Sequence, residues 1–520
     1  MSGDRRRLRG AERRPLKGYA PLLVLVGALV AMVVIVPSTV PGELASATGA
    51  GPEVVDDGRP ATGWDDTVSA CADRELQVPD LGYSPPCFSF SGDNGGATAP
   101  GVTEDTIKVS YRLTADPNLL VLLGQLGGVP LDESNEEMLS TAEALVEYFN
   151  DTFEFYGRTI ELVGYEGRGL ILSEFTGGGQ DAATNDSIKV ASEIGAFADL
   201  TGLTQPYADA LARNEVVNVG APYMSREWFE DHRPYAWSTV PDCTATAEMS
   251  AAYSNRRLFG REARWAQDDM SGDERTLAVV APNNLEYQQC VDAYEAQVTE
   301  AGHEISLRLD YILDPAQLQT QAATIMAKLK SEGTTSVSCA CDPIMQMYLA
   351  QEATASDYYP EWLIAGVGFI DLDLGGQIIS KNAPDQWVHA FGSSPSAAPQ
   401  PPETSVAHAA YRTVRQDEPS LLVDQIYSQL LTLALGIQMA GPELTPETFE
   451  TGLFAYPGGS GQAGSWDFGP GHYTPVIDIR EIWWDPAKVS PFNGQPGTYV
   501  DNTQRYVDDE IPEGDPEVFP

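Results

Sequence analysis

Two series of apolar runs, each alternating with amphipathic helical patterns, limit the fold of this chain more than any other feature. The first series opens with the strand-like alternation of residues 107–111, and apolar side chains follow at helical spacing over residues 138–149. The second series opens at residues 276–280 and continues with apolar runs at 336–339 and 362–367. Since strands buried on both faces of a parallel sheet are apolar throughout, the pattern predicts an α/β fold with two similar lobes.

The apolar segment at residues 21–36 is just long enough, together with residues 18–20, to span a membrane as a helix. Seven basic and two acidic residues lie within residues 1–17, which predicts that this basic tail stays in the cytoplasm. We expect residues 18–40 to be either an uncleaved signal anchor or a cleaved signal peptide, because the small residues 45–47 also suit a signal peptidase. Both alternatives place the rest of the chain outside the cytoplasm.

The charge of the chain excludes one class of partner. Its 31 basic and 75 acidic residues give a formal net charge of −44, and such a surface repels polyanions. We therefore expect no nucleic-acid binding driven by charge. Hydrophobic residues nevertheless make up 42% of the chain, which is enough to form a buried core.

The cysteine count fits an exported protein, because an even number of cysteines outside the cytoplasm is usually paired. Cys71 and Cys87 are expected to close one small loop. The remaining four allow three pairings that their spacing does not rank: Cys243, Cys290, Cys339 and Cys341. No histidine lies near them at zinc-ligand spacing, so we expect structural disulfides, no metal site and no cofactor.

Both ends of the exported part are rich in residues that disfavour packing. Residues 41–100 contain many Gly, Pro, Ser and Asp residues, which predicts a stalk tightened by the Cys71–Cys87 loop. Residues 486–520 are rich in Pro and acidic residues, which predicts a disordered acidic tail. The folded body is therefore expected to cover residues 101–485.

Four short motifs occur in a characteristic order along this body, at residues 101–109, 148–150, 157–162 and 464–469. Their order resembles that of the type I periplasmic binding proteins, with the branched-chain amino-acid (Leu/Ile/Val) binding proteins of ABC importers as the nearest subgroup. The resemblance implies two Rossmann-like lobes joined by a three-strand hinge. It also implies a ligand held between the lobes at the carboxyl ends of the parallel strands.

The resemblance also suggests where the chain passes between the lobes, near residues 240, 390 and 455. The expected lobes are 101–240 with 391–455 for lobe 1, and 241–390 with 456–485 for lobe 2. Two departures from the family weigh against an ordinary amino-acid ligand. Residues 113–117 replace a Ser- and Gly-rich turn after the first strand, and residues 394–420 are Pro-rich where relatives have a helix.

Strand ends of lobe 1 supply one half of the expected ligand site. The candidates carry hydroxyls or free backbone N–H groups, which suit the anionic end of a ligand. They are Thr114, Thr201, Gly202, Tyr223 and Ser225. The alternative role of the Ser and Thr residues is helix capping.

Strand ends of lobe 2 supply the other half: Asn283, Tyr287, Asp342, Phe369 and Asp371. The aromatic rings would cover the apolar part of a ligand, and either aspartate would pair with an ammonium group. The alternative roles are packing between the lobes for the aromatic residues and turn or cap formation for the acids.

No combination of nucleophile, base and orienting group stands out, and no Gly-x-Ser-x-Gly motif occurs, so we expect no enzyme activity. The sequence favours a monomeric solute-binding protein that captures a small polar solute, such as an amino acid or amide, for the membrane permease of an ABC importer. The alternative is a membrane-anchored sensor that reports its ligand to a partner protein.

Overall fold

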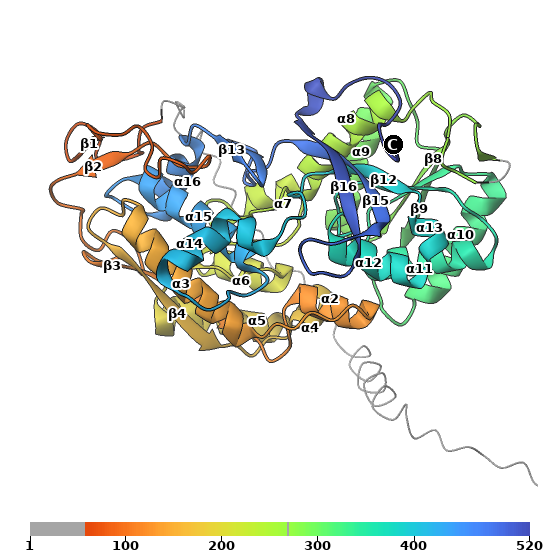
Figure 1. Cartoon of the computed structure of the whole chain (residues 1–520). Helices are drawn as coiled ribbons and strands as arrows, with labels where there is room; N and C mark the ends of the chain where they lie inside the picture. Colours follow the sequence, from red (N-terminus) through yellow and green to blue (C-terminus); the bar gives the residue numbers. More distant parts are fainter. Residues whose placement is uncertain (1–57, 268–269) are drawn as a thin grey trace, which may run out of the picture. The chain divides into compact units, whose positions relative to one another are not determined.

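The computed structural model describes residues 58–267 and 270–520, which contain two main sheets (Figure 1). The first sheet has five parallel strands in the order β4-β3-β5-β6-β7. Their bounds are Thr106–Leu113 (β3), Thr159–Glu166 (β4), Ala198–Asp199 (β5), Val217–Val219 (β6) and Ala236–Trp237 (β7). We call the residues that pack around this sheet lobe 1.

Helices cover both faces of this sheet, as expected for parallel strands. One face packs against α3, α15 and α16, and the other against α5 and α6. The helices of this lobe are α2 (Leu119–Gly127), α3 (Asn135–Thr152), α4 (Ile171–Phe175), α5 (Gln180–Ile188), α6 (Gln205–Arg213), α7 (Arg226–Asp231), α14 (Val406–Val414), α15 (Val423–Ala440) and α16 (Pro446–Phe454), with the short helices η1 (Lys189–Ile194) and η3 (Pro402–Thr404).

The second sheet has seven strands in the order β16-β15-β12-β11-β10-β8-β9 and defines lobe 2. The five strands from β12 to β9 are parallel, and β15 and β16 add to the β12 edge as an antiparallel hairpin. The bounds are Leu277–Pro282 (β8), Leu307–Tyr311 (β9), Ser336–Cys339 (β10), Glu361–Ile364 (β11), Ala390–Ser394 (β12), Ile479–Val489 (β15) and Pro496–Tyr506 (β16).

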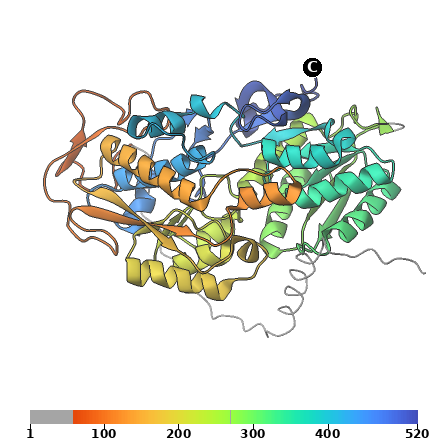
Figure 2. The same cartoon turned by 60° about the horizontal axis from the view of Figure 1, so that its bottom comes forward.

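The alternation of side chains along β8 shows how lobe 2 is layered. Leu277, Val279 and Ala281 face α8 and α9, whereas Ala278 and Val280 face the helices α10 to α12. Helices α10, α11 and α12 lie side by side in Figure 2. The helices of lobe 2 are α8 (Cys243–Arg257), α9 (Leu285–Glu300), α10 (Leu318–Glu332), α11 (Pro343–Ala355), α12 (Asp373–Asn382) and α13 (Pro384–Trp387), and η4 (Asp508–Glu510) follows β16. The α/β fold with parallel sheets is thus as predicted.

The passages between the lobes differ from the expected positions. They lie at residues 238–242, 395–405 and 477–478, between elements that belong to different cores. Residues 391–394 therefore belong to lobe 2, and residues 456–476 belong to lobe 1. The expected passage near residue 455 is wrong because the aromatic side chains that follow it, such as Tyr456 and Trp466, are buried in the core of lobe 1.

Residues 58–100 do not form a stalk in the structure, and we call them the N-terminal cap. Strands β1 (Val68–Ala70) and β2 (Phe88–Phe90) pair in an antiparallel manner, and Leu81, Tyr83 and Phe88 are buried in the core of lobe 1. The backbone N–H groups of Ala61 and Thr62 donate to carbonyls at the end of α15, at 2.7 and 3.1 Å. The expectation of a stalk is corrected for residues 58–100, because their apolar side chains join the core of lobe 1, as in the contact of Tyr83 with Trp466. Residues 41–57 of the expected stalk lie outside the described residues.

Residues 486–520 are also ordered, which corrects the expectation of a disordered tail; we call them the C-terminal extension. Strand β16 pairs along β15, and the ring of Tyr499 packs edge-on against Trp484 at 4.9 Å between centroids. Farther along, Ile511 and Val518 are 2% and 6% exposed and belong to the core of lobe 2. Composition alone missed these contacts because the buried residues lie among many acidic ones.

The six cysteines form three disulfides: Cys71–Cys87, Cys243–Cys290 and Cys339–Cys341. The first pair is as predicted, and the other two resolve the pairing that spacing left open. The expected basic tail at residues 1–17 and membrane segment at 18–40 lie outside the described residues. Within residues 58–267 and 270–520, no helix combines the length and the apolar character needed to cross a bilayer.

Candidate functional site

Loops at the carboxyl ends of the parallel strands meet where the two lobes contact each other. Ser225, which begins α7 in lobe 1, donates its hydroxyl to Gln289 Oε1 on α9 at 2.7 Å. Gln289 in turn donates to Glu227 of lobe 1 at 2.6 Å. Gln205 on α6 donates to Glu286 on α9 at 3.4 Å. These contacts join the strand ends of lobe 1 to helix α9 of lobe 2.

Three of the expected lobe 1 residues use their polar groups within their own lobe. The hydroxyl of Thr201 donates to Asp199 at 2.8 Å and accepts the backbone N–H of Arg112 at 3.0 Å. The hydroxyl of Thr114 donates to the carbonyl of Asp116 at 3.0 Å. Gly202 gives its carbonyl to the Asn218 amide at 3.1 Å, and a Cβ at Gly202 would lie 2.2 Å from that amide nitrogen. These groups therefore shape the loops.

Behind these loops lies a buried polar network that the sequence analysis did not identify. Asp199 is fully buried and accepts hydrogen bonds from Ser110 at 2.6 Å and Tyr207 at 3.0 Å. Burial raises the pKa of the Asp199 carboxyl, and its hydrogen-bond donors oppose that shift. The polar residues Ser110 and Asp199 inside otherwise apolar strands were the available signal. The network fixes the ends of β3 and β5 relative to each other.

A buried arginine extends this network. Arg112 at the end of β3 pairs with Glu174 at 2.6 Å and with Asp186 at 2.7 Å, and its guanidinium lies 4.1 Å from the ring centroid of Tyr207. The side chains of this triad are at most 2% exposed. Since both carboxylates already neutralise the guanidinium, Arg112 is a structural residue that ties α4 and α5 to the sheet.

Tyr223 differs from the other lobe 1 candidates because its hydroxyl is buried without a hydrogen-bond partner among the described residues. The nearby hydroxyl of Thr246 donates instead to the carbonyl of Asp242 at 3.0 Å. Burial raises the pKa of Tyr223 well above its usual range, the neighbouring Thr246 hydroxyl opposes that shift, and the charges of Asp242 and Asp371 raise the pKa further. Tyr223 thus presents an unused donor near acidic groups of both the first passage and lobe 2.

Asp342 and Tyr287 lie close together at the strand ends of lobe 2. One carboxylate oxygen of Asp342 caps α11 by accepting the N–H groups of Ile344 and Met345, both at 3.0 Å. The other oxygen accepts the hydroxyl of Tyr311 at 3.0 Å. Burial raises the pKa of Tyr287 to about 12, with the charges of Glu286 and Asp342 as further causes. Asp342 therefore forms the helix cap that was its alternative role, and its charge contributes to the raised pKa of Tyr287.

Asp371 is held by the passage that leaves β12. Its Oδ2 accepts the hydroxyls of Ser394 at 2.6 Å and Ser396 at 2.7 Å, and the residue is 4% exposed. The charge of Asp371 contributes to the raised pKa of Tyr223 of lobe 1. Asn283 is exposed, and its backbone N–H donates to the carbonyl of Tyr311. Nothing in its contacts brings its side chain toward the other candidates.

Phe369 belongs to an apolar cluster between the lobes. It packs with Ile344 of lobe 2 against Leu119, Leu123 and Ile171 of lobe 1. This is the packing role that was its alternative.

Helix α2, which carries two of these leucines, was not predicted from the sequence. A Cβ on its Gly127 would lie 2.3 Å from Ile378 of α12, so glycine permits the close approach. The helix follows residues 113–117, which replace the turn that the family resemblance implied.

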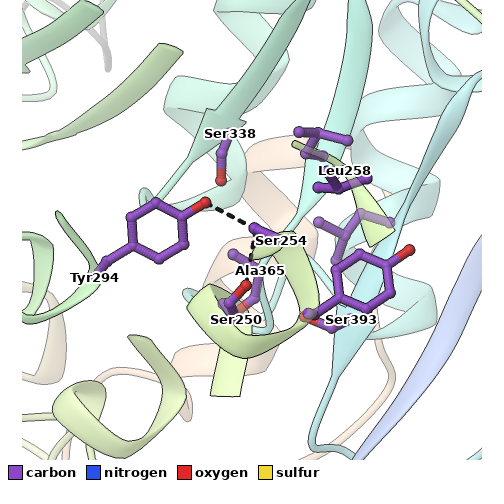
Figure 3. Close-up of a pocket in the computed structure, with 10 residues that line it drawn as sticks. Ser250, Ser254, Leu258, Tyr294, Ser338, Ala365 and Ser393 are labelled. Carbon is purple, nitrogen blue, oxygen red and sulfur yellow. Dashed lines mark hydrogen bonds between the residues drawn. The ribbon is translucent and has the colours of Figure 1, made fainter. Parts of the chain in front are cut away.

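A small cavity lies inside lobe 2, between α8, α9 and the sheet (Figure 3). Figure 3 shows the hydroxyl of Tyr294 directed at Ser254, to which it donates at 2.8 Å. The cavity measures about 10 Å³, which is room for about one water molecule. It is therefore too small for a solute.

Comparisons with known proteins agree with this architecture. No protein-family model matches the chain, and no curated protein matches its sequence. Among solved structures, a solute-binding protein of an R. palustris ABC transporter in complex with 4-hydroxybenzoate superimposes with a TM-score of 0.55 at 12% identity, covering 78% of this chain and 98% of that one.

Two further structures extend the comparison. A leucine-, isoleucine-, valine-, threonine- and alanine-binding protein from Brucella ovis, in its closed conformation, has a TM-score of 0.55 at 12% identity, covering 80% of this chain and 99% of that one. A substrate-binding protein of an Aeropyrum pernix ABC transporter has a TM-score of 0.53 at 16% identity, with coverages of 79% and 100%. The chain therefore has the fold of the type I periplasmic binding proteins.

Proposed function

We propose that the protein is an extracytoplasmic solute-binding protein that captures a small polar solute between its lobes and delivers it to the permease of an ABC importer. The observation that carries the proposal is the meeting of the strand ends of both sheets, where Ser225 of lobe 1 donates to Gln289 of lobe 2 and Phe369 of lobe 2 packs against helix α2. Ligands of open parallel sheets bind at such carboxyl ends. The export signal expected at residues 18–40 agrees with a role outside the cytoplasm.

The solved structures support a binding role rather than catalysis. They are described as solute-binding proteins, and their ligands are hydroxybenzoates in some and amino acids in others. Because the identity is 10 to 16%, these ligands serve only to choose the first compounds to test for binding to this protein. Among the described residues, most polar groups where the lobes meet already form hydrogen bonds within the protein. A ligand would therefore contact a small number of polar groups that have no partner.

The free groups favour a ligand that accepts a hydrogen bond from a phenol and tolerates neighbouring carboxylates. The hydroxyl of Tyr223 is one of the donors without a partner among the described residues, and Asp371 and Asp342 supply negative charge. A neutral amide or an amino acid meets both conditions better than a dianion does, whereas a protonated amine meets only the second. We propose that Tyr223, Tyr287, Asp342 and Asp371 contact the ligand and that Ser225 and Phe369 border the site.

A thermal-shift screen of the full-length chain tests the proposal. The compounds are amino acids, amides, polyamines, sugars and small carboxylates including 4-hydroxybenzoate. A ligand that binds the folded state adds about 2.7 kcal/mol of stability at a hundredfold excess over its Kd. A shift for one compound class supports solute binding and identifies the class. Cooperative melting without a shift from any compound contradicts the proposal.

The Tyr223→Phe variant tests the site itself. Removing a buried hydroxyl that lacks a partner is expected to leave the unliganded protein as stable as before or more stable by about 1 kcal/mol, because the desolvation cost disappears. Binding of the solute found in the screen is expected to weaken about tenfold or more, which matches the loss of one hydrogen bond. Titration calorimetry measures the affinity. Unchanged affinity in a folded variant removes Tyr223 from the site.

A further inference from the structure

Two arginines of the β15–β16 hairpin reach the backbone of the passage that leaves β12. Arg505 of β16 donates to the carbonyls of Pro395 at 2.7 Å and Ser396 at 3.1 Å. Arg480 of β15 donates to the carbonyls of Ser396 at 2.9 Å and Ala397 at 3.0 Å. Three consecutive carbonyls of one passage between the lobes are thus held by guanidinium groups fixed to lobe 2.

Arg505 also holds the passage that precedes β15. Its Nε donates to Asp478 Oδ1 at 2.8 Å, and its Nη2 lies 2.7 Å from the same oxygen. The other carboxylate oxygen of Asp478 accepts the backbone N–H of Ser465 in β14 (Gly464–Trp466) of lobe 1 at 3.0 Å. One guanidinium therefore contacts two of the three passages and reaches lobe 1 through a single carboxylate.

The backbone of lobe 1 is shaped to accept this arrangement. Gly464 has a φ of +90°, and a Cβ there would lie 2.4 Å from Asp478 Oδ1 and 2.6 Å from Arg505 Nη2. Asp478 and Arg480 are buried, being 4% and 3% exposed, and the Arg505 side chain is 18% exposed. Charge-assisted hydrogen bonds shielded from water in this way are stronger than ordinary ones.

The same passage connects to the candidate ligand site. Ser396, whose carbonyl accepts from both arginines, donates its hydroxyl to Asp371 at 2.7 Å. Opening of two lobes requires changes of φ and ψ in the segments that join them. Groups that fix the carbonyls of these segments oppose such changes.

We propose that Arg505, supported by Arg480, is a positioning residue that clamps two of the three passages between the lobes and so limits their opening. The proposed function enters this proposal at one point, the assumption that opening and closing of the lobes serve solute capture. The clamp gives the C-terminal extension a role in limiting the movement of the lobes. Ser396, whose carbonyl both arginines hold, also positions Asp371 through its hydroxyl.

Hydrogen–deuterium exchange of the unliganded full-length chain tests the clamp, with Arg505→Gln as the main variant. We expect exchange at the contacts between the lobes, residues 223–227 and 285–289, to become about tenfold faster, as for the loss of one charge-assisted hydrogen bond. Exchange in the core strand β8 is expected to stay at the wild-type rate. A purely local packing role would change exchange only near the hairpin.

Arg308→Gln is the matched control. Arg308 lies on β9 at the other edge of the same sheet, pairs with Asp292 at 2.6 Å and donates to Gln288 of α9, and its hydrogen bonds and ion pairs in the described residues reach none of the three passages. This variant removes the same charge. Because Gln288 lies within 285–289, the control is read at residues 223–227, where exchange is expected to stay at the wild-type rate.

Arg505→Lys keeps the charge but loses the fork that reaches Pro395, Ser396 and Asp478 together, so it is expected to behave like Arg505→Gln. It also carries the test if the Gln variant does not fold. The clamp is overturned if the Arg505 variant gives wild-type exchange at 223–227 and 285–289, if the increase is confined to residues near 395–397 and 478, or if Arg308→Gln gives the same increase at 223–227. None of these measurements uses a ligand, so a failed solute screen and a failed clamp are distinguishable.

Discussion

The N-terminal cap and the C-terminal extension have similar compositions, yet they act on different parts of the molecule. The cap packs on α15 and α16 of lobe 1, and Gln438 of α15 donates to the carbonyl of Pro86 in the cap at 2.9 Å. The extension continues the sheet of lobe 2 and reaches two passages between the lobes through Arg505. One addition therefore stiffens a single lobe, and the other influences how the lobes are joined.

The two additions meet at Gly464. The Tyr83 hydroxyl of the cap donates to the Gly464 carbonyl at 2.8 Å, while Arg505 of the extension would be 2.6 Å from a Cβ at the same residue. The cap and the extension therefore differ in role because their apolar and charged residues contact different surfaces, lobe 1 for the cap and lobe 2 with two passages for the extension. The following variants test that difference, from the largest expected effect to the smallest.

The strongest test of the attachment to lobe 2 is Glu481→Gln. Glu481 of β15 pairs with Arg257 of α8 at 3.0 Å, with both side chains 3% exposed, and it accepts the backbone N–H of Glu517 in the extension. Removing one partner leaves a buried guanidinium unpaired and is expected to destabilise the protein by about 3–5 kcal/mol in urea denaturation. The control Glu147→Gln breaks an exposed pair with Arg415 and should cost less than about 1 kcal/mol. Equal effects of the two variants would contradict this account.

Replacing both Cys71 and Cys87 with Ala tests the cap. The disulfide spans 16 residues, and its loss is expected to destabilise the fold by about 3 kcal/mol, mainly through greater freedom of the unfolded chain. Because the cap contacts only lobe 1, exchange between the lobes at 285–289 should change no more than exchange elsewhere. Urea denaturation measures the loss of stability, and hydrogen–deuterium exchange measures the effect at residues 285–289. A selective increase at 285–289 would remove the distinction between cap and extension.

Gly464→Ala tests the point where the two additions meet. A side chain at a φ of +90° and 2.4 Å from Asp478 forces the pair with Arg505 apart, at a cost of about 1–3 kcal/mol. We expect this variant to reproduce the faster exchange between the lobes seen for Arg505→Gln. Destabilisation without that increase would show that Gly464 serves packing alone.

The smallest expected effect is that of salt. A net charge of −44 makes the folded chain repel itself, and ions screen this repulsion over about 8 Å at physiological ionic strength. Raising the NaCl concentration is therefore expected to increase the Tm by a few degrees, which calorimetry measures. Because the Arg505 and Asp478 side chains are only 18% and 6% exposed, exchange between the lobes should respond to salt less than the Tm does. A larger response of the exchange would contradict this shielding of the clamp.

Part of the candidate site was predictable from local sequence signals. Asp342 and Ser225 begin helices directly after strands, and both are found as helix caps at the interface between the lobes. Thr201 was expected to offer its hydroxyl to a ligand, but Asp199 takes it. That difference depends on a buried carboxylate from the same loop, whose direction no periodic pattern indicates.

The sequence by itself determined the two α/β lobes, the parallel strands and the pairing of Cys71 with Cys87, because apolar periodicity and close spacing in the chain encode local structure. Only the tertiary structure decided the pairing of Cys243 with Cys290, the folding of residues 58–100 and 486–520 onto the lobes, and the contacts of Arg505 with Pro395 and Asp478. These features join residues that are tens to hundreds of positions apart. Their energies come from burial and charge pairing in three dimensions, which composition and periodicity do not record.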